Sequence, residues 1–261
     1  MSKRELFFTI ITCSKNSSST IINTINSVKK QSFTDYQHIF IDGNSTDNTV
    51  NIINKYKCNN QDKVKLFQFP SKGISDAMNI GIDKSKGKYL IHLHSDDSFF
   101  SSKVLKDVHD YLLKNPNLDW VYGKINIIDQ DINQNIGTFP NRKIFQIASQ
   151  FLLELFNFIP HQAVFIKKSV FKKFGLFDTN FKIAMDYDFW MKIHQVTRWK
   201  FTNIIVSNYG ISQNSTSSKI SNRSRGIFEY HQIHKKYLSY PMYLLSEFVL
   251  FIINKFNKTY R

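Results

Sequence analysis

The feature that most constrains this chain is a short apolar run, residues 88–94, that stops at two adjacent carboxylates, Asp96 and Asp97. The run contains no turn residue and is bounded by Gly87 and Ser95, so it predicts a buried strand. Both carboxylates would then follow its carboxyl end, where open α/β sheets bind their ligands. Adjacent carboxylates repel each other, and a hard divalent cation with phosphate ligands would relieve that repulsion. The alternative is a solvated turn before the next helix.

Strands and helices are predicted to alternate through the first half of the chain. β-branched and aromatic runs predict the strands, and apolar stripes at helical spacing predict the helices. The pattern favours an α/β fold with a mostly parallel, doubly wound central sheet flanked by helices. The predicted strands are residues 6–12, 36–41, 64–69 and 88–94, and the predicted helices are residues 17–28, 48–56 and 72–87.

The second half of the sequence is less regular. Residues 129–141 are polar and rich in turn residues, and residues 212–224 are rich in Ser and Asn, which predicts a mobile loop. The C-terminal portion is predicted to be helical. The remaining predictions are helices at residues 103–113, 145–158, 168–174 and 186–196, and strands at residues 120–128, 163–166 and 199–206.

Length and composition narrow the class of protein. The 261 residues, 42% of them hydrophobic, suffice for one large domain or two closely joined halves. The 35 Lys and Arg against 20 Asp and Glu give a net charge of +15, which favours anionic partners: nucleotide diphosphates, acidic lipids or nucleic acid. Two cysteines, Cys13 and Cys58, indicate neither a disulfide framework nor a Cys-rich zinc site, and favour the cytosol. We expect neither a signal peptide nor a membrane span.

Several different short motifs follow one another along the chain, at residues 9–12, 26–33, 41–49, 72–81, 93–97, 161–162, 175–178 and 186–190. The most specific of them is Ile41-Asp42-Gly43-Asn44-Ser45-Thr46-Asp47. In this order and spacing they resemble glycosyltransferase family 2, the nucleotide-sugar transferases with the GT-A fold, of the type that builds bacterial surface polysaccharides. The resemblance implies a Rossmann-like GT-A domain with a helical C-terminal extension. Its implied parts are a nucleotide-sugar-binding half (1–97), an acceptor-binding and catalytic half (98–210), and a basic loop with amphipathic helices (211–261).

The resemblance also implies an activity and a set of site residues. The chain would be an inverting hexosyl- or N-acetylhexosaminyltransferase that uses a UDP-sugar and a glycan or lipid-linked acceptor. Asp186 matches the catalytic base, and Asp96 and Asp97 match the residues that hold Mg²⁺ or Mn²⁺. The implied donor-binding residues are Thr12, Asp42, Lys72, Gly73, Asp76, Asn79, His94, Ser95 and Asp96. The implied acceptor-binding residues are His161, Gln162, Asp188 and Trp190.

Several of these residues have a structural alternative. His94 replaces the first aspartate of the family's metal motif; a neutral histidine can still bind a metal, a phosphate or a ribose hydroxyl, or it can pack at a strand end. Asp42 alternatively belongs to an Asx turn, and Lys72 to the exposed surface. Carboxylates such as Asp76 and Asp186 also stabilise helix starts, and His161 is alternatively a core residue.

Two other classes of function are less consistent with the sequence. A nucleotidyltransferase would carry a Gly-rich phosphate loop after the first strand, but residues 13–17 contain no glycine. A nucleic-acid-binding protein would interleave basic and aromatic residues on one face, whereas the positive charge here is spread over helices and loops. We therefore expect no nucleic-acid partner.

The end of the chain predicts an amphipathic helix. Its apolar arc is too short to span a bilayer but suits a helix lying on the cytoplasmic face of an anionic membrane, near Lys235, Lys236, Lys255 and Arg261. The alternative is a helix packed on the protein's own core. The predicted location is therefore cytoplasmic, with peripheral membrane binding. The apolar arc consists of Leu244, Leu245, Phe248, Val249, Phe251, Ile252, Ile253 and Phe256.

Overall fold

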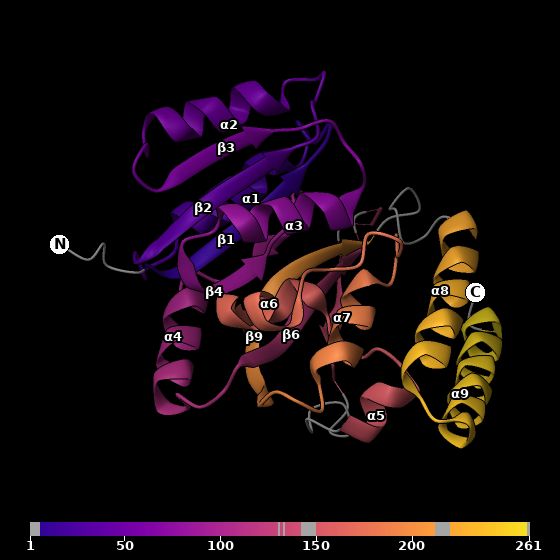
Figure 1. Ribbon diagram of the computed structural model, residues 1–261. Helices are drawn as coiled ribbons and strands as arrows, with labels where there is room; N and C mark the ends of the chain where they lie inside the picture. Colours follow the sequence, from indigo (N-terminus) through magenta and orange to yellow (C-terminus); the bar gives the residue numbers. More distant parts are fainter. Residues whose placement is uncertain (1–5, 130, 133, 142–149, 212–219, 260–261) are drawn as a thin grey trace.

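The computed structural model describes residues 6–129, 131–132, 134–141, 150–211 and 220–259, with side chains except at 220–223 and 254–259. The described chain forms one nine-stranded sheet with helices on both faces (Figure 1). The strand order is β3-β2-β1-β4-β8-β6-β9-β5, and β7 pairs with β6 outside this path. Strands from residues 1–97 and from residues 98–211 belong to this one sheet, so both halves of the chain share one scaffold.

The first four strands are parallel and match the alternation read from the sequence. Their apolar side chains alternate between two faces. Ile39 and Ile41 pack with Met78 and Ile82 of α3 on one face, while Phe40 packs with α1 and α2 on the other. These elements are β1 (Leu6–Ser14), β2 (Tyr36–Asp42), β3 (Val64–Gln68), β4 (Gly87–His92), α1 (Ile21–Lys29), α2 (Thr49–Cys58) and α3 (Ile74–Lys84).

The second half of the sheet is mixed. β8 (Val164–Lys167) is antiparallel to both β4 and β6 (Trp120–Asp129), which joins it to the parallel half. β9 (Trp199–Ile211) is parallel to β6 and extends beyond residue 206, where the prediction ended. β5 (Ser98–Phe99) pairs with β9, and β7 (Gln134–Phe139) pairs with β6. The prediction of a turn-rich segment at residues 129–141 was therefore wrong for β7.

The helices of the second half largely follow the predictions. The predicted helix at residues 145–158 is described only as α5 (Gln150–Leu155), and residues 145–149 lie outside the description. Of the predicted loop at residues 212–224, residues 212–219 lie outside the description and Ile220 already begins a helix. The remaining elements are α4 (Val104–Lys114), a 3₁₀ turn (His161–Ala163), α6 (Lys168–Phe174), α7 (Met185–Ile193), α8 (Ile220–Tyr237) and α9 (Tyr240–Thr259).

The core of the second half is aromatic. Trp120 of β6 stacks on Trp190 of α7 and on Trp199 of β9, with ring centroids 5.0 and 4.8 Å apart. Stacked rings of this size bury large apolar areas and fix the helix relative to the sheet. This packing sets the position of α7, which begins at the edge of the sheet where β1, β2 and β4 end.

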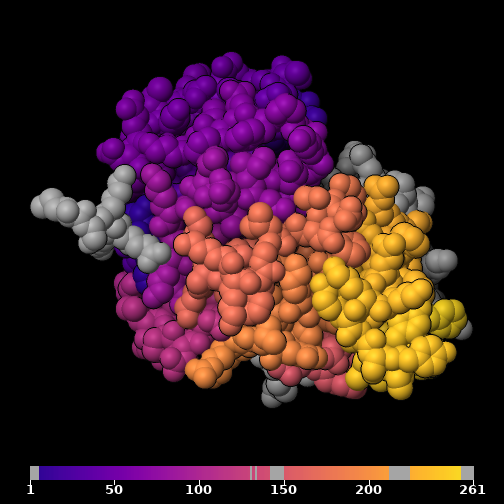
Figure 2. Space-filling view, in the orientation of Figure 1, coloured from indigo at the N-terminus to yellow at the C-terminus, as the bar shows by residue number. Residues whose placement is uncertain are grey.

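α8 and α9 form an antiparallel hairpin at one side of the molecule, drawn in gold and yellow in Figures 1 and 2. α8 contacts α7, and α9 contacts α5. In the described part of the chain, no helix has the length and apolar character needed to cross a membrane.

Candidate active site

A cleft of about 650 Å³ opens at the carboxyl ends of β1, β2 and β4. Its remaining walls come from the starts of α3 and α7 and from the 3₁₀ turn. This is the edge of an α/β sheet at which ligands bind. The predicted site residues that line it are Asp42, Lys72, Gly73, Asp76, His94, Ser95, Asp96, Asp97, His161, Gln162 and Asp186.

Asp42 ends β2, and its buried carboxylate is held by neighbouring hydroxyl and amide groups. Ser14 donates from its Oγ to Asp42 Oδ2 at 2.9 Å. Ser45 donates twice, from its Oγ to Oδ2 at 2.6 Å and from its backbone N–H to Oδ1 at 2.8 Å. A carboxylate can accept about four hydrogen bonds. Asp42 therefore keeps capacity for one further donor, and its orientation is fixed beforehand.

The start of α3 forms the basic wall of the cleft. Gly73 precedes the helix with φ = 115°, a value that favours glycine, and so lets the chain turn sharply into the helix. Lys72 is exposed beside it, and Lys15 and Lys182 line the same cleft from other segments. Three lysines and the positive end of a helix dipole favour an anionic ligand here.

The turn after β4 separates its two carboxylates. Asp96 is exposed, whereas Asp97 is buried, and Asp97 Oδ2 accepts the backbone N–H of His94 at 3.3 Å. Burial, with the nearby charge of Asp96, raises the pKa of Asp97 well above its ordinary value. Burial also lowers the pKa of His94 to about 3. Asp96 thus faces the cleft, and Asp97 holds the turn.

Asp186 lies in the first turn of α7, opposite the 3₁₀ turn. Its Oδ2 is 3.7 Å from Nδ1 of His161, and its Oδ1 accepts the N–H of Tyr187 at 2.8 Å. Burial raises the pKa of Asp186 to about 6 and lowers that of His161 to about 4. At neutral pH this gives an ionised carboxylate of raised basicity beside a neutral imidazole. Such a carboxylate is suited to act as a general base.

A family model described as "Glycosyl transferase family 2" matches residues 9–175 of this chain. The chain belongs to glycosyl transferase family 2. Among similar proteins, a PGL/p-HBAD biosynthesis glycosyltransferase of Mycobacterium bovis is 27% identical over 209 residues, which cover 77% of this chain and 76% of the relative. This family member is therefore a glycosyltransferase, and the cleft lies where its fold binds ligands.

Solved structures agree on the GT-A fold. Residues 1–349 of Staphylococcus aureus TarS align with a TM-score of 0.67 at 19% identity, over 87% of this chain and 65% of that one. The same fragment has also been solved with UDP and with UDP-GlcNAc. The mannosyltransferase PcManGT of Pyrobaculum calidifontis, solved with GDP-Man and Mn²⁺, aligns with a TM-score of 0.70 at 14% identity, over 94% and 69%. This glycosyltransferase thus spans slightly less than two thirds of the TarS fragment.

Four predicted site residues of the glycosyltransferase do not line the cleft. Thr12 is buried between strands and donates to the Leu93 carbonyl at 2.6 Å. Asn79 exchanges two hydrogen bonds with the backbone of Phe177. Trp190 lies in the tryptophan stack, and Asp188 is buried toward α8. Their contacts are structural because helical spacing and strand alternation turn these side chains away from the cleft.

Other residues of the cleft were not among the predicted site residues. Ser14 orients Asp42 together with Ser45, which lies behind the cleft lining, and Ser17 accepts a hydrogen bond from Ser95 at 2.8 Å. Lys182 comes from the segment before α7, more than a hundred residues beyond Lys72. A second cleft, of about 540 Å³, is lined by Lys114, Arg198 and Lys200 among others, and none of the described residues that line it is a carboxylate. We therefore place no chemistry there.

The fold family implies a divalent cation, and the residues present fit one. Within the described residues, no group of three or more His, Cys, Asp or Glu side chains converges to hold a metal alone. Mg²⁺ and Mn²⁺ in nucleotide enzymes, however, commonly use one or two carboxylates, with phosphate oxygens and water completing the shell. Asp96, exposed in the cleft beside the basic wall, is a donor of this kind.

Proposed function

We propose that this glycosyltransferase moves a hexosyl or N-acetylhexosaminyl group from a UDP-sugar to a glycan or lipid-linked acceptor, with inversion at the anomeric carbon, in the synthesis of a surface polysaccharide. The observation that carries the proposal is the meeting of Asp42, Asp96 and Asp186 with the start of α3 in one cleft. In this proposal residues 1–97 bind the donor, residues 98–210 the acceptor, and residues 211–261 supply basic and amphipathic surface.

The donor lies along the ends of β1, β2 and β4. Asp42 accepts the N3–H of uracil with the acceptor capacity that Ser14 and Ser45 leave free. Lys72 and the start of α3 bind the diphosphate, since both are positive. Asp76, His94 and Ser95 line the cleft between these two groups and contact the ribose or the sugar.

A divalent cation held by Asp96 and the diphosphate would neutralise charge on the leaving group. His94 stands where the family has an aspartate, so this chain offers one carboxylate fewer to that cation. The basic wall compensates in part, because Lys15, Lys72 and Lys182 add positive charge around the same cleft. The negative charge that develops on the leaving diphosphate is therefore stabilised by the positive charge around it.

Asp186 acts as the base. The acceptor hydroxyl oxygen attacks the anomeric carbon from the face opposite the diphosphate, and Asp186 takes its proton as the new C–O bond forms. The bond to the diphosphate oxygen breaks with its electron pair, which leaves a nucleoside diphosphate and a glycoside of inverted configuration. His161 is neutral and lies against Asp186, so it orients the carboxylate without quenching its charge. Gln162, beside it, lines the acceptor side of the cleft.

The α8–α9 hairpin would bind an anionic membrane that presents a lipid-linked acceptor. Tyr240, Leu244, Phe248 and Phe251 of α9 lie on one helical face and are 50% to 72% exposed. Such an exposed apolar stripe marks an interaction site more often than ordinary surface. Val249, Ile252 and Ile253 of the predicted arc are half-buried, and the side chain of Phe256 lies outside the description. This proposal places the enzyme on the cytoplasmic face of the membrane.

A thermal-shift panel of UDP-, GDP- and dTDP-sugars with Mn²⁺ tests the donor class. A ligand at a hundredfold excess over its Kd stabilises the native state by about 2.7 kcal/mol, so a specific donor will raise the melting temperature measurably. Product stereochemistry by NMR then tests the mechanism. Absence of stabilisation by every nucleotide sugar contradicts the donor proposal, and retention at the anomeric carbon contradicts the single displacement.

A further inference from the structure

The start of α7 has no hydrogen-bonding cap of its own. Its N-cap residue is Ala184, whose methyl group cannot accept a backbone N–H. The first backbone N–H groups of a helix lack partners within the helix and need an acceptor from elsewhere. Asp186 is the second residue of α7, so its position follows from where the helix begins.

Glu229 of α8 instead holds the N-cap residue and the two residues before it. Its Oε1 accepts the N–H of Lys182 at 2.9 Å, and its Oε2 accepts the N–H groups of Ile183 and Ala184, both at 2.8 Å. The Glu229 side chain is buried, with 4% exposure. A carboxylate at this end of a helix also interacts favourably with the helix dipole. One side chain therefore fixes three consecutive residues that lead into α7.

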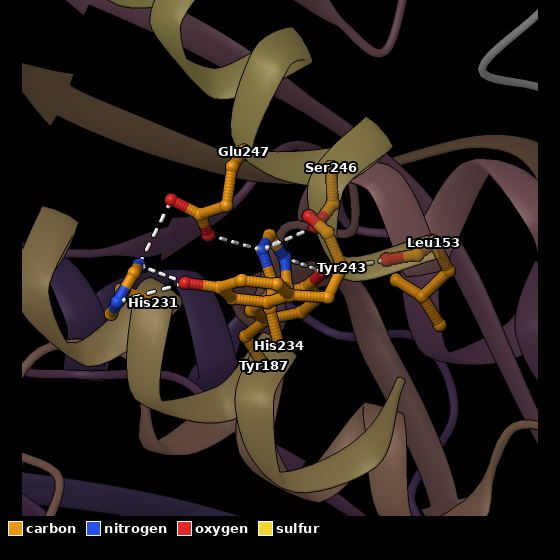
Figure 3. A network of polar contacts seen from close by, with 7 residues as sticks. All are labelled: Leu153, Tyr187, His231, His234, Tyr243, Ser246 and Glu247. Atoms are coloured by element: carbon orange, nitrogen blue, oxygen red, sulfur yellow. Dashed lines mark hydrogen bonds and ion pairs between the residues drawn. The ribbon is translucent and has the colours of Figure 1, made fainter. Parts of the chain in front are cut away.

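The residues directly after Asp186 are also held by α8. Figure 3 shows the Tyr187 hydroxyl against Nε2 of His234, at 2.9 Å, while Ser246 and Glu247 of α9 contact the other ring nitrogen. Asp188 Oδ1 accepts hydrogen bonds from Lys236 Nζ at 2.8 Å and from the Tyr237 hydroxyl at 3.1 Å. The segment is thus anchored to α8 before and after Asp186, while the Asp186 carboxylate faces the cleft.

We propose that Glu229 is a positioning residue for the transfer step, and that α8 is part of the frame that aims Asp186. The inference rests on Asp186 being the base. By fixing residues 182–184, Glu229 sets where α7 begins, and with it the 3.7 Å separation between Asp186 and His161. A misplacement of about 1 Å at a reacting group can slow catalysis a hundredfold. Lys182, which lines the cleft, is held by the same carboxylate.

The chain offers a matched control at the opposite end of the same helix. Glu154 is also a largely buried carboxylate; its Oε1 contacts His194 Nε2 at 3.2 Å and accepts a hydrogen bond from Gln195 Nε2 at 2.8 Å. Glu154→Gln changes hydrogen bonds at the carboxyl end of α7, whereas Glu229→Gln changes those before its start. Any effect shared by Glu154→Gln and Glu229→Gln is therefore a general effect of loosening α7.

The test compares Glu229→Gln, Glu229→Asp and Glu154→Gln with the parent chain. The amide of Gln cannot accept all three N–H groups, and the shorter Asp cannot reach them all. We expect kcat to fall at least tenfold in both Glu229 variants, with donor affinity within a few-fold of the parent and amide hydrogen exchange at residues 182–188 at least tenfold faster. Glu154→Gln should leave kcat within twofold. If Glu229→Gln does not fold, the Asp variant carries the comparison.

Two results overturn the inference: a kcat within twofold of the parent in the Glu229 variants, or an equal fall in Glu154→Gln. Asp186→Asn in the same assay separates this failure from that of the proposed base. If Asp186→Asn is nearly inactive and the Glu229 variants are not, only the role of Glu229 is wrong. If Asp186→Asn keeps its rate, Asp186 is not the base, and Glu229 positions no catalytic group.

Discussion

Nδ1 of His161 lies 3.7 Å from Oδ2 of Asp186, and both largely buried side chains line the cleft. Burial lowers the pKa of His161 to about 4 and raises the pKa of Asp186 to about 6, which reverses their ordinary order. At neutral pH Asp186 is therefore ionised, and the neutral His161 does not offset its charge. The pair therefore keeps the Asp186 carboxylate basic, as proton removal from a sugar hydroxyl requires.

The pH dependence of turnover should show this raised pKa. We expect kcat to rise with pH through about 6, because Asp186 must lose its proton before it can accept one from the acceptor. Asp186→Asn should lower turnover by roughly a hundredfold or more, with little change in donor affinity. Single-turnover rates between pH 5 and pH 8 would check both expectations. A rate independent of pH in this range contradicts the assignment.

Asp186→Asn should also stabilise the protein at neutral pH. A folded-state pKa of about 6, raised from 3.8 by burial, means that ionisation opposes folding, so stability is lost as pH rises through 6. Removing the charge should recover up to about 3 kcal/mol above that pH and nothing below pH 4. Melting temperatures of parent and variant at pH 4 and pH 7.5 would show the difference. Equal melting temperatures at both pH values contradict the raised pKa.

Asp96→Ala should weaken metal binding in the presence of nucleotide. Asp96 is the exposed carboxylate of the turn after β4, whereas Asp97 is buried and hydrogen-bonded to the backbone of His94. Mn²⁺ titrations followed by electron paramagnetic resonance, with UDP present, should show an affinity loss of about tenfold or more. Full turnover in excess EDTA would show that the cation is dispensable. His94→Asp, which restores the family's motif, should strengthen Mn²⁺ binding.

Asp42→Asn should weaken donor binding by about tenfold, because a hydrogen bond to a charged group contributes about 1.5–3 kcal/mol and an amide presents one acceptor oxygen in place of two. Asp47→Asn is the matched control. Asp47 lies in the same motif, but its carboxylate accepts bonds from Thr49 and Ser18 and it does not line the cleft. Its substitution should lower stability and leave donor affinity unchanged. Calorimetric titration with UDP would measure both variants, and equal affinities in the two would exclude a base contact by Asp42.

The membrane proposal is best tested by surface substitutions on α9. Phe248→Ser with Phe251→Ser removes the two most apolar exposed side chains of the stripe and spares Ser246 and Glu247, which hold His234. We expect the parent to float with anionic vesicles and the double variant to remain in the soluble fraction. Leu113→Ser, an equally exposed leucine on α4, should float like the parent. Recovery of all three at the same level contradicts the proposal.

Residues at the ends of strands could be located from the sequence, because an apolar run that stops at a carboxylate marks both a strand and its end. Asp42 and Asp96 were predicted in this way and lie together in the cleft. β7 could not be found similarly. Its strand is short, pairs with β6 alone and is largely exposed, so it lacks the apolar signal of a buried strand.

Contacts between distant segments were also invisible in the sequence. Asp188 lies in the same motif as Asp186, yet its partner Lys236 is on a helix that starts more than thirty residues later. Glu229 belongs to no recognisable motif, because polar residues occur on any helix. Only the packing of α8 against α7 brings the Glu229 carboxylate to the backbone of Ala184. Periodicity predicts which residues face inward but not which distant backbone they meet.

The hydrogen bond between Glu229 and the Ala184 backbone also affects the order in which the chain can fold during its synthesis. The two residues are 45 positions apart, and at about 5–20 residues per second a ribosome needs about 2–9 seconds to travel between them. The parallel strands that carry Asp42 and Asp96 are already complete by then. A nascent chain thus completes the part of the cleft that contains Asp42 and Asp96 first, and the segment that bears Asp186 is held in place only once the last helices emerge.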